Sequence, residues 1–252
     1  MSGMNAQTVA EVTEKLRLAS ENTTRMYNVG FEAGRELGDE VFWDSIQAYG
    51  TRTDYEYLFR DTRWDRPFNP KYSFGNVLKA HNVFKNTKVG DNLYTDKLDF
   101  SKCAVMDGAF SGSDVTRLKR IDLRGCSPAY NGANTVFLGC SSLKEITEFY
   151  PPTNTNPTMA FDYCDSLETL NVCSEIAVNG FDFRRATKLS KASIKSIIGA
   201  LSIGTSGLSI TLSRAAVNKA FETSEGANDG ENSTEWTDDI IDANYNWNIV
   251  LA

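Results

Sequence analysis

Cysteine and histidine are the residues of this sequence that first suggest chemistry. His81 is the only histidine, so the chain cannot form a metal centre that needs two histidines. A Cys–His nucleophile would rest on His81 alone. The five cysteines include no C-x-x-C pair, which favours neither a zinc ribbon nor a dense disulfide framework. They are Cys103, Cys126, Cys140, Cys164 and Cys173.

Carboxylates are the second group of residues with catalytic or metal-binding chemistry. The chain has 33 Asp and Glu residues, but no two stand out as the paired acids of a glycoside hydrolase. The phosphate-binding motifs GxxxxGK[ST] and GxGxxG do not occur. We therefore predict no enzymatic activity, no cofactor and no metal site. Calcium in an acidic loop is the alternative, with Asn228, Asp229, Glu231 and Asn232 as oxygen ligands, although their spacing differs from a calcium-loop motif.

The overall composition is typical of a globular protein. Of 252 residues, 41% are hydrophobic and 23% are charged. The net charge of -7 arises in residues 220–252, which contain eight acids and no Lys or Arg. The rest is nearly neutral and has no basic face for nucleic acid. No apolar run of about 18 residues predicts membrane insertion, and residues 1–14 do not resemble a secretory signal.

The N-terminal segment has the apolar spacing of a coiled-coil helix. Residues three and four apart form a seam, which Thr23 and Gly30 weaken. Its apolar members are Val9, Val12, Leu16, Ala19, Met26, Ala33 and Leu37. Sister helices or a partner groove normally bury such a narrow seam. We therefore predict that residues 1–38 form an oligomerisation helix. A helix packed on its own domain is the alternative.

Residues 39–75 are expected to form a short helix followed by an aromatic segment. Tyr55, Tyr57 and Phe59 alternate with polar neighbours, as in a half-buried strand. We interpret the segment as an N-terminal cap for the repeats that follow. The alternative is a platform for sugar or protein, with Tyr55, Tyr57 and Trp64 as a possible interaction surface.

Residues 76–189 contain a repeat in which phenylalanines recur every 22 to 27 residues. The clearest units, 137–146 and 161–170, share the pattern F-x-x-C-x-x-L-x-x-[IL]. One unit cannot bury its own apolar face, so about five units should stack, each with a short strand that shows alternate residues to the core. The predicted core contains Phe84, Phe110, Phe137, Cys140, Leu143, Ile146, Phe161, Cys164, Leu167, Leu170 and Phe183.

The repeat gives the cysteines and the histidine a structural interpretation. Cys140 and Cys164 occupy equivalent positions, where a thiol fills a tight corner as a small hydrophobe. Cys126 and Cys173 follow expected strands. We predict that all four are reduced core residues, and that His81 has a structural role in the first repeat.

Residues 190–252 are expected to form a C-terminal α/β cap. The predicted elements are a helix over 190–201 capped by Ser190, a strand over 208–212, a helix from Ser213 to about Glu222, a helix after Thr237 and a strand over 247–251. A strand–helix–strand arrangement of this kind would shield the last repeat.

The motif in units 137–146 and 161–170 resembles leucine-rich repeats of the BspA type, in which a Phe, a small residue with Cys, Ser-Leu and a short strand recur. The resemblance covers roughly residues 76–186. It implies a fold of the α+β class, in which an N-terminal coiled-coil helix precedes a short leucine-rich-repeat solenoid with a C-terminal α/β cap. The family mediates binding on bacterial surfaces and also occurs in viruses and protists.

A broader resemblance links most of the chain to tail and baseplate proteins encoded by phages of gut bacteria. It rests on Glu14-Lys15-Leu16 in the N-terminal helix, Phe42-Trp43-Asp44 after it, and Phe68-Asn69-Pro70-Lys71-Tyr72 before the repeats. The acidic loop near the C-terminus departs from this pattern.

This resemblance implies a non-enzymatic virion protein that is made in the bacterial cytoplasm. We expect a homo-oligomer, preferably a trimer, that contacts other virion proteins and presents its repeats to a host receptor or glycan. The alternatives are a bacterial surface adhesion module that binds host protein or glycan and, more remotely, a polysaccharide depolymerase. We expect no nucleic-acid partner and no membrane insertion.

Overall fold

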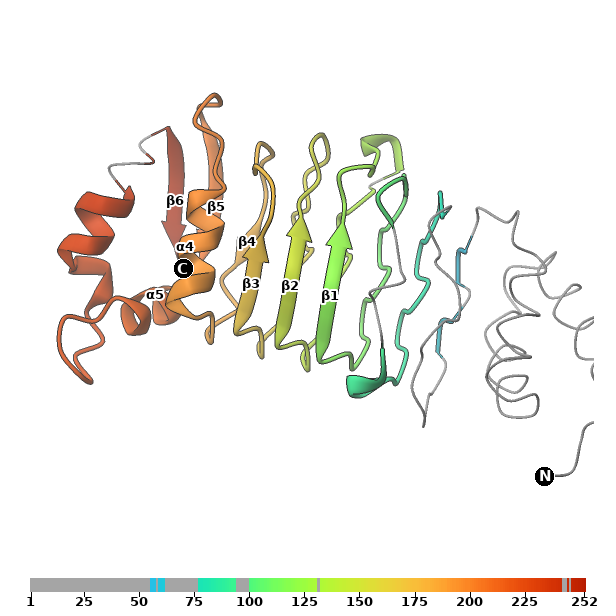
Figure 1. Ribbon diagram of the computed structural model, residues 1–252, viewed down its shortest axis with the longest axis horizontal. Helices are drawn as coiled ribbons and strands as arrows, with labels where there is room; N and C mark the ends of the chain where they lie inside the picture. The colour runs from blue at the N-terminus through green and yellow to red at the C-terminus, as the bar shows by residue number, and fades with distance from the viewer. Residues whose placement is uncertain are drawn as a thin grey trace, which may run out of the picture.

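The described part of the chain is a row of transverse segments that lie one beside the next in the order of the sequence (Figure 1). The computed structural model describes residues 55–57, 59–61, 77–93, 100–130, 132–241, 244 and 246–252. The predicted coiled coil over 1–38, with its seam from Val9 to Leu37, lies outside the described residues, as does Trp64.

Strands from three successive repeat units form a parallel sheet (Figure 1). The strands are β1 (Arg117–Asp122), β2 (Glu145–Tyr150) and β3 (Thr169–Val172), in that order. Leu118 lies opposite Ile146, which lies opposite Leu170. Each repeat period therefore returns the chain to the same face with the same polarity, which antiparallel hairpins would not do.

The buried apolar residues of β1 and β2 are spaced three apart instead of two. Leu118 and Ile121 are buried in β1, as are Ile146 and Phe149 in β2. The pairing of β2 with β3 changes register between Ile146 and Phe149. An irregularity of this kind inserts one residue and re-aims the next side chain towards the core. The prediction that alternate residues face the core is therefore wrong for these two strands.

A row of phenylalanine rings runs through the core beside this sheet. Successive ring centroids from Phe84 through Phe110, Phe137, Phe161 and Phe183 lie 5.4, 5.7, 5.1 and 4.8 Å apart. Rings at these separations attract each other beyond the effect of burial. All the residues of the predicted repeat core are buried.

Phe59 adds a further ring at the N-terminal end of the row. Its centroid lies 5.3 Å from that of Phe84, and its side chain is buried. Tyr57 has a φ of 60°, and its amide N–H donates to the carbonyl oxygen of His81. The segment around Phe59 is therefore a turn that pairs with the next repeat unit, and the prediction of a half-buried strand there is wrong.

The same turn recurs beside the other phenylalanines. The residue two positions after each ring from Phe59 to Phe161 has a φ between 55° and 76°; these residues are Asp61, Asn86, Gly112, Gly139 and Tyr163. The amide N–H of Phe84 donates to Ala109 O at 2.7 Å, and the amide N–H of Phe110 donates to Val136 O at 2.8 Å. Backbone hydrogen bonds therefore join each repeat unit to the next on this side of the core.

A second parallel sheet continues the phenylalanine row at the C-terminal end. Its strands are β4 (Asp182–Phe183), β5 (Leu208–Leu212) and β6 (Trp247–Leu251), in that order. Phe183 lies opposite Leu212, which lies opposite Leu251. Helix α5 (Arg214–Ala220) follows β5, and the Ser213 hydroxyl accepts the Ala216 amide at its start. The predicted strands over 208–212 and 247–251 and the cap at Ser213 are confirmed.

Helix α4 (Lys191–Gly199) closes the edge of the first sheet beside β3 (Figure 1). The Ser190 hydroxyl accepts the Ser193 amide at 3.2 Å, which confirms the predicted N-cap. The hydroxyl oxygens of Ser193 and Ser196 accept the amides of Leu170 and Val172 in β3 at 3.0 and 2.8 Å. These edge amides therefore have partners, which blunts the edge as a template for another strand.

The remaining described elements are short. They are the 3-10 helices η1 (Gly90–Asn92), η3 (Pro128–Tyr130) and η4 (Gly230–Asn232), and the π-helix η5 (Glu235–Ile241). The helix expected after Thr237 begins earlier, because Trp236 packs against Phe221 with ring centroids 5.3 Å apart.

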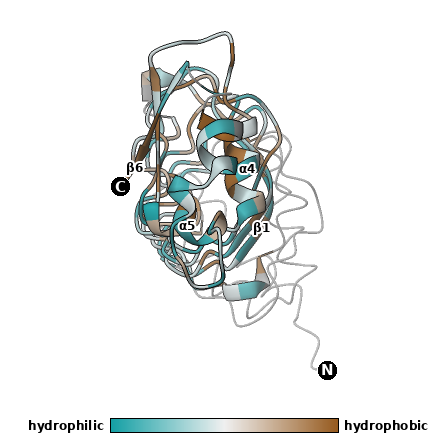
Figure 2. Ribbon diagram, turned by 90° about the vertical axis from the view of Figure 1, so that its left-hand side faces the viewer, coloured by the Kyte–Doolittle hydropathy of each residue, from teal (hydrophilic) through white to brown (hydrophobic). Residues whose placement is uncertain are grey.

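Seen from the C-terminal end, equivalent segments lie behind one another (Figure 2). The described residues thus form few helices and two small parallel sheets. None of these helices is long and apolar enough to cross a membrane. The wider α+β fold with leucine-rich repeats stays a prediction.

Candidate functional site

The buried thiols tie neighbouring repeat units together. Cys140 Sγ donates to Phe110 O at 2.9 Å, and Cys164 Sγ donates to Phe137 O at 3.3 Å. Burial raises the pKa of Cys140 to about 12 and that of Cys164 well above its usual value. Both thiols are therefore protonated at neutral pH, whereas nucleophiles and metal ligands are thiolates. Their interpretation as small hydrophobes needs a correction, because each is also a hydrogen-bond donor.

The other cysteines divide into buried and exposed groups. Cys103 and Cys126 are buried, and burial also raises the pKa of the Cys126 thiol. Cys173, which directly follows β3, is exposed. The prediction that Cys173 belongs to the core is therefore wrong. At the end of a strand the direction of a side chain depends on the local turn, which the repeat pattern does not specify.

His81 lies in a chain of polar contacts that crosses four repeat units. A hydrogen bond of 3.4 Å links Tyr57 Oη and His81 Nδ1, and His81 Nε2 lies 4.0 Å from Asp107 Oδ2. Asp107 Oδ1 accepts the amide and the hydroxyl of Thr135 at 3.0 and 2.5 Å. Each partner comes from a different repeat unit, so this group joins the units through their side chains.

The acids of the C-terminal loop bind protein donors. Asp229 accepts the amide and the hydroxyl of Thr223 at 2.9 and 2.5 Å, and these hydrogen bonds lower its pKa. Glu231 pairs with Arg214 and also accepts Asn218 Nδ2 at 3.3 Å. Within the described ranges no three His, Cys, Asp or Glu side chains form a group that could hold a metal ion. Two of the four residues considered for calcium, Asp229 and Glu231, thus bind donors of the chain itself.

The outward side of the first sheet carries a regular polar array, which we call the sheet face. The Thr147 hydroxyl donates to Lys119 O at 2.8 Å, and Asn171 Nδ2 donates to Thr147 O at 3.1 Å. Ion pairs of 3.6 Å join β1 to β2 on the same side, between Arg117 and Glu145 and between Arg120 and Glu148. The sheet face comprises Arg117, Lys119, Arg120, Glu145, Thr147, Glu148 and Asn171.

One end of the sheet face is held by a buried carboxylate. Asp122, whose side chain is 1% exposed, accepts Arg124 Nε at 2.9 Å, Arg124 Nη2 at 2.6 Å and Arg120 Nη2 at 3.3 Å. Both guanidinium carbons lie 4.5 Å from the centroid of the Tyr150 ring. Burial alone would raise the pKa of Asp122, but the hydrogen bonds and charge of the arginines outweigh it and lower the pKa.

The cluster around Asp122 was not predicted, although the sequence contains a signal for it. Asp122, the last residue of β1, begins an Asp-x-Arg sequence, and a second one, Asp182 to Arg184, begins at the first residue of β4. In the second copy Arg184 Nε also donates to the aspartate, at 2.7 Å. Tyr150 is not recognisable from that signal, because it comes from the neighbouring repeat unit.

Tyr55 and Tyr57, two of the three aromatic residues proposed from sequence as an interaction surface, do not join the sheet face. Tyr55 and Tyr57 are half-buried at the N-terminal end of the described row.

No protein-family model, curated protein or solved structure matches this chain. Because no related protein identifies a site, the choice of the sheet face as the candidate site rests on the geometry of the described residues.

Proposed function

We propose that this chain is a non-enzymatic structural protein of a phage virion. It is a tail, baseplate or fibre component whose repeat units present the sheet face to a host receptor or to another protein. The binding role is supported by what the chemically reactive side chains contact. Cys140, Cys164, His81 and Asp107 hold repeat units together, whereas the sheet face offers polar groups at regular spacing.

The repeat units fit a short solenoid of BspA-type leucine-rich repeats. In support, β1, β2 and β3 pair in parallel at equivalent repeat positions, and the phenylalanine rings stack in the order of the sequence. Such units contact mainly their neighbours, which leaves the sheet face over β1, β2 and β3 available to a ligand. An open polar sheet suits an extended ligand that makes many side-chain hydrogen bonds.

The proposed assembly is a homotrimer formed through the seam from Val9 to Leu37. Light scattering of the full chain at micromolar concentration tests this part of the proposal. A mass of three chains supports it, and a variant with Leu16→Asp and Met26→Asp should then dissociate. A monomeric mass for the unmodified chain would overturn the oligomer.

Binding of the labelled protein to host cells tests the sheet face. Glu145→Lys with Glu148→Lys reverses two of its charges, whereas Glu222→Lys with Glu225→Lys makes the same charge change away from the sheet. We expect binding to fall about tenfold or more for the first pair only, since charge complementarity sets specificity. Equal binding by both pairs would contradict the proposed surface. Melting temperatures should confirm that both variants are folded.

Placement in the virion has its own test. Purified phage particles should contain peptides of this chain at a fixed ratio to the major tail protein. Peptides found instead in the cell-surface fraction of uninfected bacteria would favour the adhesion module. New reducing ends after incubation with host surface polysaccharide would favour the depolymerase.

A further inference from the structure

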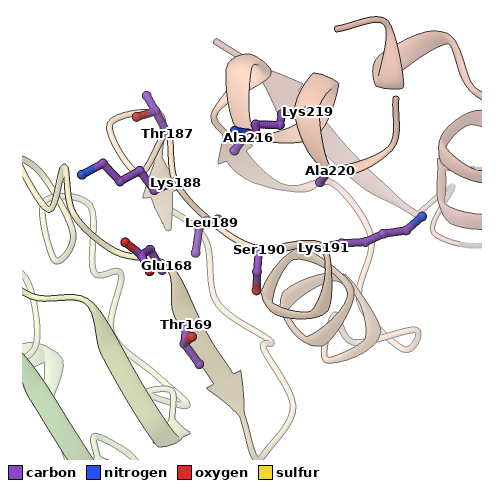
Figure 3. A pocket seen from close by; sticks show the side chains of 10 residues that line it. All are labelled: Glu168, Thr169, Thr187, Lys188, Leu189, Ser190, Lys191, Ala216, Lys219 and Ala220. Carbon is purple, nitrogen blue, oxygen red and sulfur yellow. The ribbon is translucent and has the colours of Figure 1, made fainter. Parts of the chain in front are cut away.

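A groove of about 550 Å³ lies between the start of β3, the segment 187–190 and helix α5 (Figure 3). This volume falls within the range of small-molecule sites in proteins. The groove is outside the sheet face, and none of the interactions described above accounts for it. Its walls come from parts of the chain that are distant in sequence and meet where α5 packs near the beginning of α4.

Lysine side chains dominate the charge of this groove. Lys188, Lys191 and Lys219 line it, and Glu168 is its one acidic residue. Lys191 Nζ is held by Glu235 at 2.6 Å and extends away from the other two lysines (Figure 3). For Lys188 and Lys219, no carboxylate oxygen of the described residues lies within the 4.0 Å of an ion pair. Within the described residues these two ammonium groups thus form no ion pair, in a chain of net charge -7.

The rest of the lining suits a small polar ring. Leu189 and Ala216 are buried and give the groove an apolar floor. Thr187 and Glu168 lie on its exposed side and can exchange hydrogen bonds with hydroxyl groups. A sugar has a C–H face for such a floor and hydroxyls for such a rim. Lys188 and Lys219 lie on opposite sides of the groove (Figure 3), and an anionic substituent would meet one of these two ammonium groups in a charge-assisted hydrogen bond.

We propose that this groove binds an anionic sugar, a pyranose ring that carries a carboxylate or a phosphate. This inference extends the proposed host recognition. It rests on that proposed function only for the biological source of the sugar. The lysines are exposed, so the attraction is screened by salt and the affinity falls as ionic strength rises.

Calorimetric titration of the full chain tests the proposal with three probes: digalacturonate, glucose 6-phosphate and neutral galactobiose. We expect at least one anionic probe to bind about tenfold more tightly than galactobiose, because neutral sugar lacks the charge-assisted contacts. Lys188→Ala with Lys219→Ala should remove this preference. Lys88→Ala with Lys102→Ala removes two exposed lysines elsewhere and should retain it. The anionic probe that binds distinguishes a carboxylated from a phosphorylated source.

Two results would contradict the proposed binding of an anionic sugar in the groove. One is the absence of binding by both anionic probes, and the other is equal binding by the groove variant and the unmodified chain. Neither result affects the proposed function, because cell binding that depends on Glu145 and Glu148 would still support the sheet face. The converse outcome is saturable binding of an anionic probe while the variant with Glu145→Lys and Glu148→Lys binds cells as well as the unmodified chain. This pair of results would support the sugar site in the groove and contradict the sheet face as the receptor-binding surface.

Discussion

The thiol of Cys140 donates a hydrogen bond of 2.9 Å to the carbonyl oxygen of Phe110, which lies in the preceding repeat unit. The same relation joins Cys164 to Phe137, and the hydroxyl of Thr87 makes it with Phe59 at 2.7 Å. The position three residues after Phe84, Phe137 and Phe161 is therefore a position for a buried donor. A cysteine at this position therefore donates a hydrogen bond to the preceding unit, as a threonine does.

Replacement of Cys140 tests the value of that donor. Cys140→Ala removes this donor, while Phe110 O still accepts the Ser113 amide at 2.9 Å, and we expect a loss of about 0.5–1.5 kcal/mol in the free energy of unfolding. Cys140→Ser retains a donor and should lose less. Urea unfolding monitored by circular dichroism measures both. An alanine variant as stable as the serine variant would show that the thiol acts only by filling space.

Thiol reactivity should separate Cys173 from the other cysteines. The exposed Cys173 should react rapidly with a thiol reagent in the native protein, while the buried thiols react only after unfolding. Because burial raises the pKa of Cys140 to about 12, moderately alkaline pH should not expose it to the reagent as a thiolate. Cys173→Ser should abolish the rapid phase. A second rapid thiol in that variant would contradict the burial described here.

Loss of the buried carboxylate should destabilise one end of the sheet face. Asp122→Asn removes the charge that Arg124 and Arg120 share, and we expect a loss of about 2–3 kcal/mol at neutral pH, as for hydrogen bonds to charged groups. Asp182→Asn alters the same Asp-x-Arg sequence at a more exposed carboxylate, 26% exposed, and should cost less. Equal losses in the two variants would argue against burial as the cause.

The pH dependence of the Asp122 effect has a definite sign. The pKa of Asp122 in the folded chain lies below its usual 3.8, so its contribution is complete above that value. The contribution disappears as the pH falls from 3.8 through the folded pKa. The stability difference between the unmodified chain and Asp122→Asn should therefore shrink over that acidic range. A difference that grows there would contradict the lowered pKa.

Gly112 should tolerate no side chain, for two reasons. Its φ is 67°, and a Cβ atom there would overlap Asn86 Oδ1 of the preceding unit. We expect Gly112→Ala to lower the midpoint of thermal unfolding, with a cost of about 1 kcal/mol or more from the backbone alone. Adding Asn86→Ala should relieve only the overlap. Gly199→Ala at the end of α4, where the space is open, should be neutral or stabilising.

A charge in the repeat core should unfold the row. Leu143 is fully buried, and Leu143→Asp places an unpaired carboxylate among apolar side chains. We expect loss of the cooperative unfolding transition at room temperature. Ser141→Asp makes the same charge two residues away at an exposed position and should leave the melting temperature nearly unchanged. An unchanged melting temperature for Leu143→Asp would mean that the repeat register is wrong.

Local and periodic features were predictable from the sequence. Phe137 and Phe161 identified the repeat period, and Ser190 identified the start of α4, because N-caps satisfy amides within a few residues. The sequence predicts a cap around Phe59, because the first unit of a repeat array needs its open end covered. The role of Phe59 became evident only from the 5.3 Å ring contact with Phe84.

The candidate sites depended on contacts between units. Arg124 lies close to Asp122 in sequence, but Tyr150 reaches the pair only because β1 and β2 align in parallel. Lys188 and Lys219 line one groove because α5 folds back towards the segment before α4.

The length of the repeat, most of the buried side chains and the helix caps could be predicted from the sequence. These features follow from apolar periodicity and from hydrogen bonds between near neighbours. The folded chain was needed to show which donor meets which carbonyl, that Cys173 is exposed and that Lys188 and Lys219 line one groove. A contact between two repeat units depends on register and on the direction of each side chain, and a spacing along one chain specifies neither.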